Sequence, residues 1–168
     1  MFIAHIPAGY ILTKIMPPKT KSAALWATGL FFAVAPDLDL FYFYLFSARR
    51  VPHHAYVTHW PLLWVALAAA VFMVSLILHK RSWRPFIAVG LATVLLHLVL
   101  DSIAAEIYWL APFSYKYINI VEVPARYSWW VYSFIFHWTF ALEVVICIAA
   151  LVILIFSRVK KSAALPSC

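Results

Sequence analysis

The chain has 168 residues, of which 66% are hydrophobic, 18% aromatic and only 11% charged, which excludes an ordinary soluble domain and is typical of a polytopic membrane protein. The net charge of +7 does not indicate nucleic-acid binding, because the basic residues lie in short clusters between apolar segments. Two cysteines, Cys147 and Cys168, offer neither a disulfide framework nor a cysteine-based zinc site.

The first segment, residues 1–21, predicts a short helix that does not cross a membrane. Its apolar part, Phe2 to Met16, is too short to span a bilayer as a helix. Pro7 suits a first helical turn, and Pro17-Pro18 must end the helix. We therefore expect a half-span or interfacial helix with His5 near its start. A basic loop follows, containing Lys14, Lys19 and Lys21.

Four transmembrane helices are predicted after this segment, at about residues 22–46, 61–79, 85–105 and 129–156. Residues 1–168 are therefore expected to form a single all-α membrane domain. One side of the predicted bundle holds nine of the thirteen lysines and arginines, so the positive-inside rule places that side in the cytoplasm. The polar loop before residue 61 and the aromatic connection 106–128 then face outward.

The first predicted span is interrupted by Pro36-Asp37-Leu38-Asp39. A proline removes a backbone hydrogen bond and moves the residue before it away from helical geometry, so a break is expected here. Asp37 and Asp39 would then lie just inside a second short helix, where the helix N-terminus favours negative charge. In an unwound turn, both carboxylates can point to the same side.

The third predicted span contains His97 and Asp101, four residues apart. On a helix this spacing places both side chains on one face. The pair can hold a metal ion between them, or the aspartate can orient the imidazole.

Polar groups from separate segments are expected at a common depth. A helix rises about 1.5 Å per residue, and counting from the basic clusters puts five residues in the outer half of the membrane: Asp37, His59, His97, Asp101 and Glu143. The spans contain no lysine or arginine, so the acids need protonation, histidine, loop arginines or a bound metal as compensation. Several carboxylates and histidines together favour a divalent metal; we expect zinc, with manganese as the alternative.

Each of these groups also has a purely structural alternative. His97 and Asp101 would then be a packed hydrogen-bonded pair, and the two acids at the break would cap a helix. His59 would be an interfacial histidine, and one of His53 and His54 would be solvated. Two polar residues of the last span are six apart, lie on different helix faces and are expected to make structural hydrogen bonds: His137 and Glu143.

These motifs together resemble the bacterial inner-membrane metal-dependent hydrolases, also described as LexA-binding inner-membrane-associated hydrolases. The matching segments are His5 with Gly9, Pro36-Asp37-Leu38-Asp39, His54-Ala-Tyr-Val-Thr58-His59, His97-Leu-Val-Leu-Asp101 and Pro112-Phe113-Ser114. The resemblance runs over most of residues 1–145 and implies a metal-dependent hydrolase of the inner membrane, without a defined substrate. Many relatives carry His-Arg-Gly before the Thr-His, where this chain has His54-Ala55-Tyr56. If that arginine binds substrate, Arg49 or Arg50 would have to replace it.

The preferred hypothesis is a multi-pass, metal-dependent hydrolase of a lipid or lipid-linked phosphoester, with its site in the outer half of the bilayer. The expected metal ligands are Asp37, Asp39, His54, His59, His97, Asp101 and His5, and catalytic roles are expected for Asp37, His59 and Asp101. A substrate phosphate would contact Arg49, Arg50 or Arg126. The expected partners are a membrane lipid and a small-molecule or lipid phosphoester, with no nucleic acid.

Two other functions stay open. Intramembrane acids and histidines also build proton- or metal-coupled transporters, although four spans without an internal repeat offer no alternating-access pair. A non-catalytic membrane regulatory protein is the third reading.

Overall fold

A computed structural model describes residues 3–46 and 52–163, with side chains as far as Val159, and this part of the chain is helical. The helices are α1 (His5–Ile15), α2 (Ala23–Phe32), α3 (Asp39–Leu45), α4 (Pro61–Ile77), α5 (Arg84–Asp101), α6 (Trp130–Ile135) and α7 (Thr139–Ala163). The 3-10 turns are η1 (Pro36–Leu38), η2 (His53–Ala55), η3 (Val57–His59) and η4 (Arg81–Trp83). No strand occurs in the described residues, which confirms the predicted all-α class.

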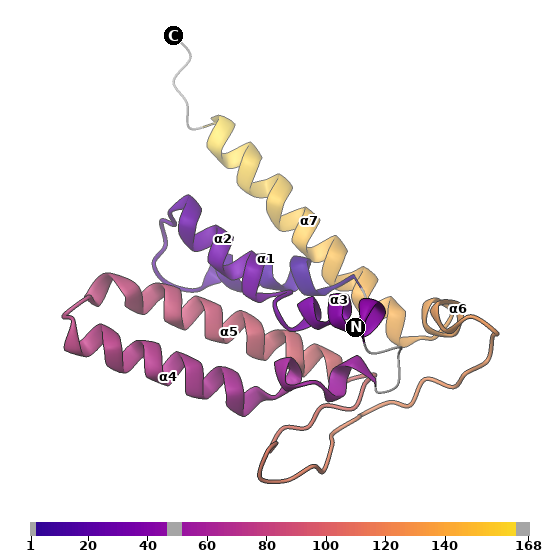
Figure 1. The fold of residues 1–168 in the computed structure, drawn as a ribbon. Coiled ribbons are helices and arrows are strands. Elements are labelled where there is room, and N and C mark those ends of the chain that lie inside the picture. The colour runs from indigo at the N-terminus through magenta and orange to yellow at the C-terminus, as the bar shows by residue number, and fades with distance from the viewer. Residues whose placement is uncertain (1–2, 47–51, 164–168) are drawn as a thin grey trace.

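Helix α5 is the centre of the bundle. It packs against α1, α2 and α4, and Val89, Val94 and Leu98 on it are completely buried. Helices α4 and α5 run side by side as a hairpin, α1 and α2 cover α5, and α7 leaves the bundle at an angle (Figure 1). The two polar residues at the C-terminal end of α5, His97 and Asp101, are therefore surrounded by other elements.

Helices α1 and α2 approach each other closely at two glycines. A Cβ atom on Gly9 would overlap the Cβ of Ala33, and one on Gly29 would overlap the side chain of Thr13. Small residues permit such approaches between helices in lipid, where van der Waals packing holds helices together. The short helix α1, His5–Ile15, is thereby held against the bundle.

The predicted break in the first span is confirmed. Helix α2 starts at an N-cap formed by Ser22, whose hydroxyl accepts a hydrogen bond from the backbone N–H of Leu25 at 3.2 Å. After it, η1 contains Asp37 and α3 begins with Asp39. The segments Ala23–Phe32 and Pro36–Leu45 are bent by 64° relative to each other, so the two acids lie at the bend.

The expectation of four transmembrane spans is wrong when the helices are judged by their length and apolar composition. Two helices of the described residues are long and apolar enough to cross a membrane, Arg81–Asp101 and Thr139–Val159, or three spans if the bent pair is counted as one. Helix α4 has 17 residues because it ends in a Schellman turn: His79 has a φ of 52°, and the N–H of Lys80 bonds the carbonyl of Ser75 at 2.8 Å. The last predicted span starts late because the chain breaks between α6 and α7.

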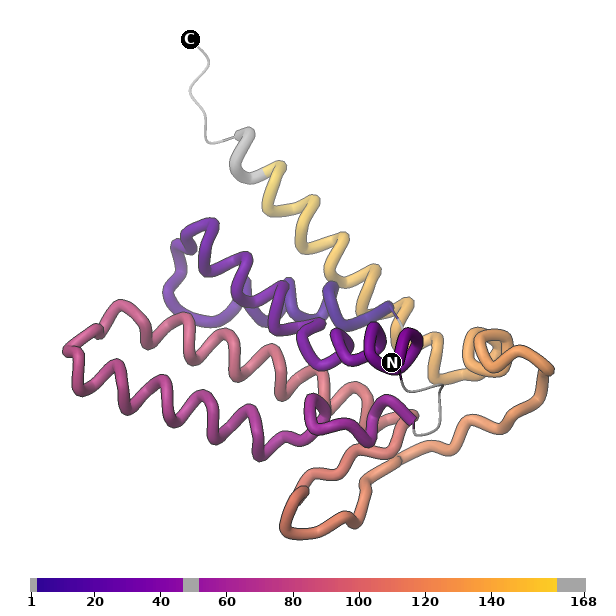
Figure 2. The backbone as a smooth tube through the Cα atoms, in the orientation of Figure 1, coloured from indigo at the N-terminus to yellow at the C-terminus, as the bar shows by residue number. Residues whose placement is uncertain are grey.

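The connection between α5 and α6 contains no regular helix. It extends away from the bundle before it reaches α6 (Figure 2). An isolated antiparallel bridge joins Ile107 to Ile118, and the N–H of Ile120 bonds the carbonyl of Ser102 at 2.9 Å. These bonds fasten the connection to the end of α5, beside His97 and Asp101.

Candidate metal centre

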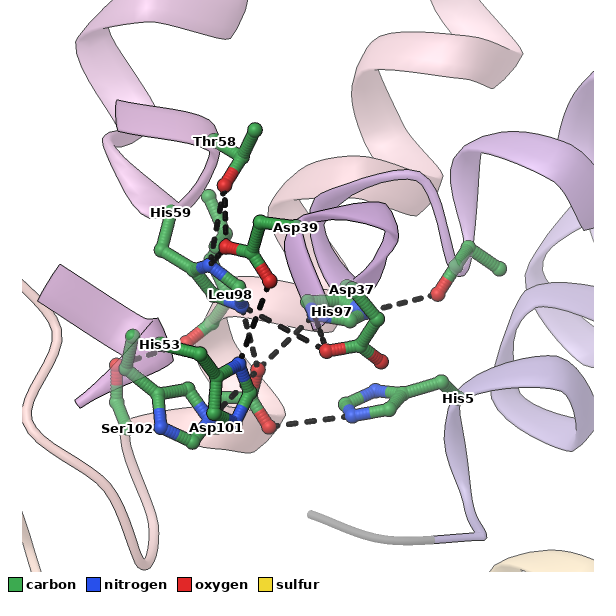
Figure 3. Close-up of polar contacts among 12 residues, drawn as sticks. His5, Asp37, Asp39, His53, Thr58, His59, His97, Leu98, Asp101 and Ser102 are labelled. Atoms are coloured by element: carbon green, nitrogen blue, oxygen red, sulfur yellow. Dashed lines mark hydrogen bonds and ion pairs between the residues drawn. The ribbon is translucent and has the colours of Figure 1, made fainter. Parts of the chain in front are cut away.

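Four side chains meet where the break of the first span faces the end of α5. Asp37, His59, His97 and Asp101 each offer one ligand atom, and these atoms all lie within 4.8 Å of one another. They come from three segments that are far apart in the sequence (Figure 3). His59, His97 and Asp101 are buried, and Asp37 is partly exposed. The cluster thus has one open side.

The distances within this cluster fit a single ion. Nε2 of His97 lies 2.9 Å from Oδ2 of Asp101 and 3.7 Å from Oδ1 of Asp37. Nε2 of His59 lies 3.7 Å from Oδ1 of Asp37 and 3.9 Å from Oδ2 of Asp101. Nitrogen and oxygen ligands about 2.0–2.2 Å from a tetrahedral zinc lie about 3.3–3.6 Å apart, so the observed separations bracket that value.

The buried histidine nitrogens of the cluster make no hydrogen bond. Nε2 of both His59 and His97 is buried and has no hydrogen-bond partner in the described residues, although carboxylate oxygens are close. A buried polar nitrogen without a partner destabilises a protein by roughly 1–3 kcal/mol. These two nitrogens point toward a common centre, which is the arrangement that a metal ion would satisfy.

The opposite nitrogen of each ring is held by an acceptor. Nδ1 of His59 lies 2.9 Å from Oδ2 of Asp39, and Nδ1 of His97 lies 2.8 Å from the carbonyl oxygen of Ala33. The Thr58 hydroxyl donates to the same oxygen of Asp39 at 2.5 Å. With Nδ1–H donating, each ring presents the Nε2 lone pair to the cluster, as metal-binding histidines usually do.

The pKa values of His59 and His54, which precede α4, are shifted in opposite directions. Burial alone would lower the pKa of His59, but the neighbouring carboxylates of Asp37 and Asp39 outweigh it and raise the pKa from 6.5 to about 9. A metal ion must therefore displace a proton from His59 in neutral solution. For His54, burial lowers the pKa to about 3, with partial opposition from Asp101, so this ring is neutral and able to act as a ligand.

Three further histidines surround the cluster. Nε2 of His5 lies 3.1 Å from Oδ1 of Asp101, and its ring stacks on that of His97 with 3.8 Å between centroids. Nε2 of His54 lies 3.8 Å from Oδ2 of Asp101. His53 completes a second group with His54 and His59 whose ligand atoms could also hold an ion.

The predicted ligands therefore occupy different positions. Asp37, His59, His97 and Asp101 form the cluster, while His5 and His54 contact it through Asp101. Asp39 contacts the outer nitrogen of His59, and its Oδ1 lies 3.5 Å from Nδ1 of His53. This geometry suits Asp39 to orienting a ligand.

The predicted substrate arginines are not part of the cluster. Arg49 and Arg50 lie outside the described residues. Arg126 is exposed in the connection before α6, and its backbone N–H donates to the hydroxyl of Ser133 at 3.0 Å. A cavity of about 920 Å³ adjoins the cluster and is lined by Asp37, His53 and His54, among others, but not by Arg126.

The two polar residues of the last predicted span have structural contacts. The Glu143 carboxylate is buried and accepts hydrogen bonds from the backbone N–H groups of Ile3 at 2.5 Å and Ala4 at 3.1 Å. A carboxylate at the start of α1 satisfies exposed amides and complements the helix dipole. His137 lies 2.9 Å from the Thr139 hydroxyl at the start of α7.

The sequence alone did not assign roles to two of these partners. The carbonyl of Ala33 carries no sequence signal, because every residue has one. Thr58 precedes His59 directly, and a threonine beside a candidate ligand histidine was a signal that could have been used.

Comparison with known proteins identifies a family. A family model described as YdjM inner membrane protein matches residues 1–163, a range that contains every residue of the cluster. No match was found among curated proteins or solved structures.

Proposed function

The chain belongs to the YdjM inner membrane protein family, and from the cluster of Asp37, His59, His97 and Asp101 we propose that it is a metal-dependent hydrolase of the inner membrane. One observation supports the proposal above all others. Two buried Nε2 atoms lack hydrogen bonds and converge with two carboxylates, while their rings are held from behind by Asp39 and Ala33.

The chemistry of the donor set suits zinc, with manganese as the second candidate. A divalent ion held by these four residues would supply Lewis-acid activation of water and of a phosphoryl oxygen. The proposal assigns substrate contact to Asp37, because its carboxylate belongs to the cluster, lines the cavity and has a side chain that is 26% exposed.

In the proposed reaction, a water oxygen bonds to phosphorus and the ester P–O bond breaks. Asp37 is placed to accept the proton that the water loses and to return it to the leaving oxygen as that oxygen departs. His59 and Asp101 would hold their charged or polar groups at fixed positions around the phosphoryl group. Both side chains are buried, His59 is held by Asp39, and Asp101 is held by His5.

The membrane arrangement is part of the proposal. The crossings would be α5, α7 and the bent pair, and the shorter apolar helix α4, which packs against α5, would lie beside it in the membrane. With the basic turns in the cytoplasm, the cluster would lie in the outer half of the bilayer. A membrane lipid phosphoester is then the substrate that reaches it most directly.

Metal analysis of the detergent-purified protein tests this function. We expect near-stoichiometric zinc or manganese in the wild type, loss of it in an Asp37→Ala/Asp101→Ala variant, and no loss in the exposed-residue control Lys116→Gln. The metal-loaded wild type should hydrolyse a phosphodiester, and Asp101→Asn should not while remaining inserted in the membrane.

A negative result has a clear consequence. If the wild type holds no metal and added metal does not raise its unfolding temperature, the hydrolase proposal is wrong. Proton or metal flux across sealed vesicles would then be the function to measure.

A further inference from the structure

The cavity beside the cluster has an acidic wall. It is lined by Asp37, His53 and His54 from the region of the cluster, and by Glu106 and Glu122 from the connection before α6. Its volume of about 920 Å³ is that of a site for a sizeable small molecule. Four aromatic side chains complete the wall: Phe43, Tyr44, Trp130 and Phe134.

The charged residues among those that line the cavity and are described by the structure are mainly acidic. None of the described residues that line it is a lysine or an arginine, whereas two carboxylates besides Asp37 do line it. A second phosphate or an anionic headgroup would be repelled by Glu106 and Glu122. A cation would be attracted both by these carboxylates and by the faces of the aromatic rings.

An acceptor without a hydrogen-bond partner in the described residues also lines the cavity. Oδ1 of Asn119 is buried and has no hydrogen-bond partner in the described residues. It is an acceptor that an N–H donor entering the cavity would satisfy. Carboxylates, an amide oxygen and aromatic rings are the groups that bind a primary ammonium ion.

We propose that this cavity binds the ammonium group of an amine-bearing phosphodiester headgroup, with Glu106 and Glu122 as its ionic partners. The inference rests on the proposed function, because it places the phosphodiester of the same molecule at Asp37 and the adjoining cluster. A lipid of the phosphoethanolamine type has this chemistry, and the apolar and aromatic part of the wall suits a ligand that arrives from the bilayer.

Equilibrium binding measures this preference independently of turnover. Short-chain dihexanoylphosphatidylethanolamine and dihexanoylphosphatidylglycerol are titrated into the detergent-purified protein, with tryptophan fluorescence as the signal because Trp130 lines the cavity. We expect the ethanolamine lipid to bind at least tenfold more tightly. A Glu106→Gln/Glu122→Gln variant should lose that preference, and the exposed control Lys116→Gln should keep it.

Two further ligands test separately whether the ammonium charge and the acyl chains contribute to binding. An N-acetylated ethanolamine lipid, which has no ammonium charge, should bind as weakly as the glycerol lipid. Glycerophosphoethanolamine carries the same headgroup without acyl chains; if it binds as tightly as the lipid, the ammonium subsite stands and its ligand is a soluble one.

The inference is overturned if the glycerol lipid binds as tightly as the ethanolamine lipid, or if the glutamine variant keeps the preference. Metal content is measured on the same samples. Bound metal with no amine preference removes only this inference, whereas a wild type without metal removes the proposed function.

Discussion

Substitution of Asp39 by asparagine separates an orienting role from a ligand role. Oδ2 of Asp39 lies 2.9 Å from Nδ1 of His59 and also accepts from the Thr58 hydroxyl, so it holds the ring from behind. Asparagine keeps the size and an acceptor oxygen but removes the charge. The hydrogen bond to His59 therefore weakens without disappearing.

The expected magnitude follows from that change. A hydrogen bond to a charged group contributes about 1.5–3 kcal/mol and a neutral one about 0.5–1.5, a difference of about 1–1.5 kcal/mol. This corresponds to a loss of zinc affinity of about 5- to 13-fold, close to the lower end of the roughly 10- to 100-fold range for groups that orient metal-binding histidines. Asp101→Asn, which alters a carboxylate of the cluster itself, should cost more than about 100-fold.

A competitive titration against a fluorescent zinc chelator measures both variants in detergent, beside the exposed control Lys116→Gln. Size-exclusion elution at the wild-type position shows that each variant is folded. If Asp39→Asn binds zinc as tightly as the wild type, Asp39 does not orient His59. If it binds as weakly as Asp101→Asn, Asp39 is a ligand and the assignment of roles is wrong.

Three other predictions concern the surroundings of the cluster. In chelator-treated protein, the raised His59 pKa of about 9 contributes stability that is complete below pH 6.5 and is lost as the pH rises through 9. The unfolding temperature should therefore fall over that pH window. An unfolding temperature that does not change with pH would refute this prediction. Gly9→Val should overlap Ala33, displace α1 and lower metal content, whereas Gly9→Ala should do so less; unchanged metal in the valine variant would contradict the close approach. Glu143→Leu should destabilise the protein by about 1–3 kcal/mol in denaturant titrations because two amides lose their acceptor, with Glu143→Gln retaining most of the stability.

Local patterns predicted the parts of the site that depend on short-range geometry. His97 and Asp101 lie on one face of α5 because four residues make about one helical turn. The break at Pro36 follows from the missing N–H of proline, and it places Asp37 and Asp39 at a bend of 64°. Neither result needed any knowledge of the rest of the fold.

The division of roles between Asp37 and Asp39 could not be predicted in this way. Both follow the same proline, and only the position of η3 decides which carboxylate faces Nε2 of His59 and which faces Nδ1. The contact of Glu143 with the start of α1 joins residues 140 positions apart in the chain, which no local pattern reports. The number of spans was overestimated because neither the turn at His79 nor the break before Thr139 is marked by glycine or proline.

The cluster also has to hold the helices together. In lipid, the hydrophobic effect gives no attraction between apolar helices, so close packing and polar contacts hold them. His5 joins α1 to α5 through Asp101, His97 joins α5 to the chain after α2 through Ala33, and His59 joins the start of α4 to Asp37. Two carboxylates that face one centre repel each other, and a divalent ion would reverse that repulsion. Metal removal should therefore loosen these helix ends and shift the unfolding of the whole bundle, beyond the loss of activity.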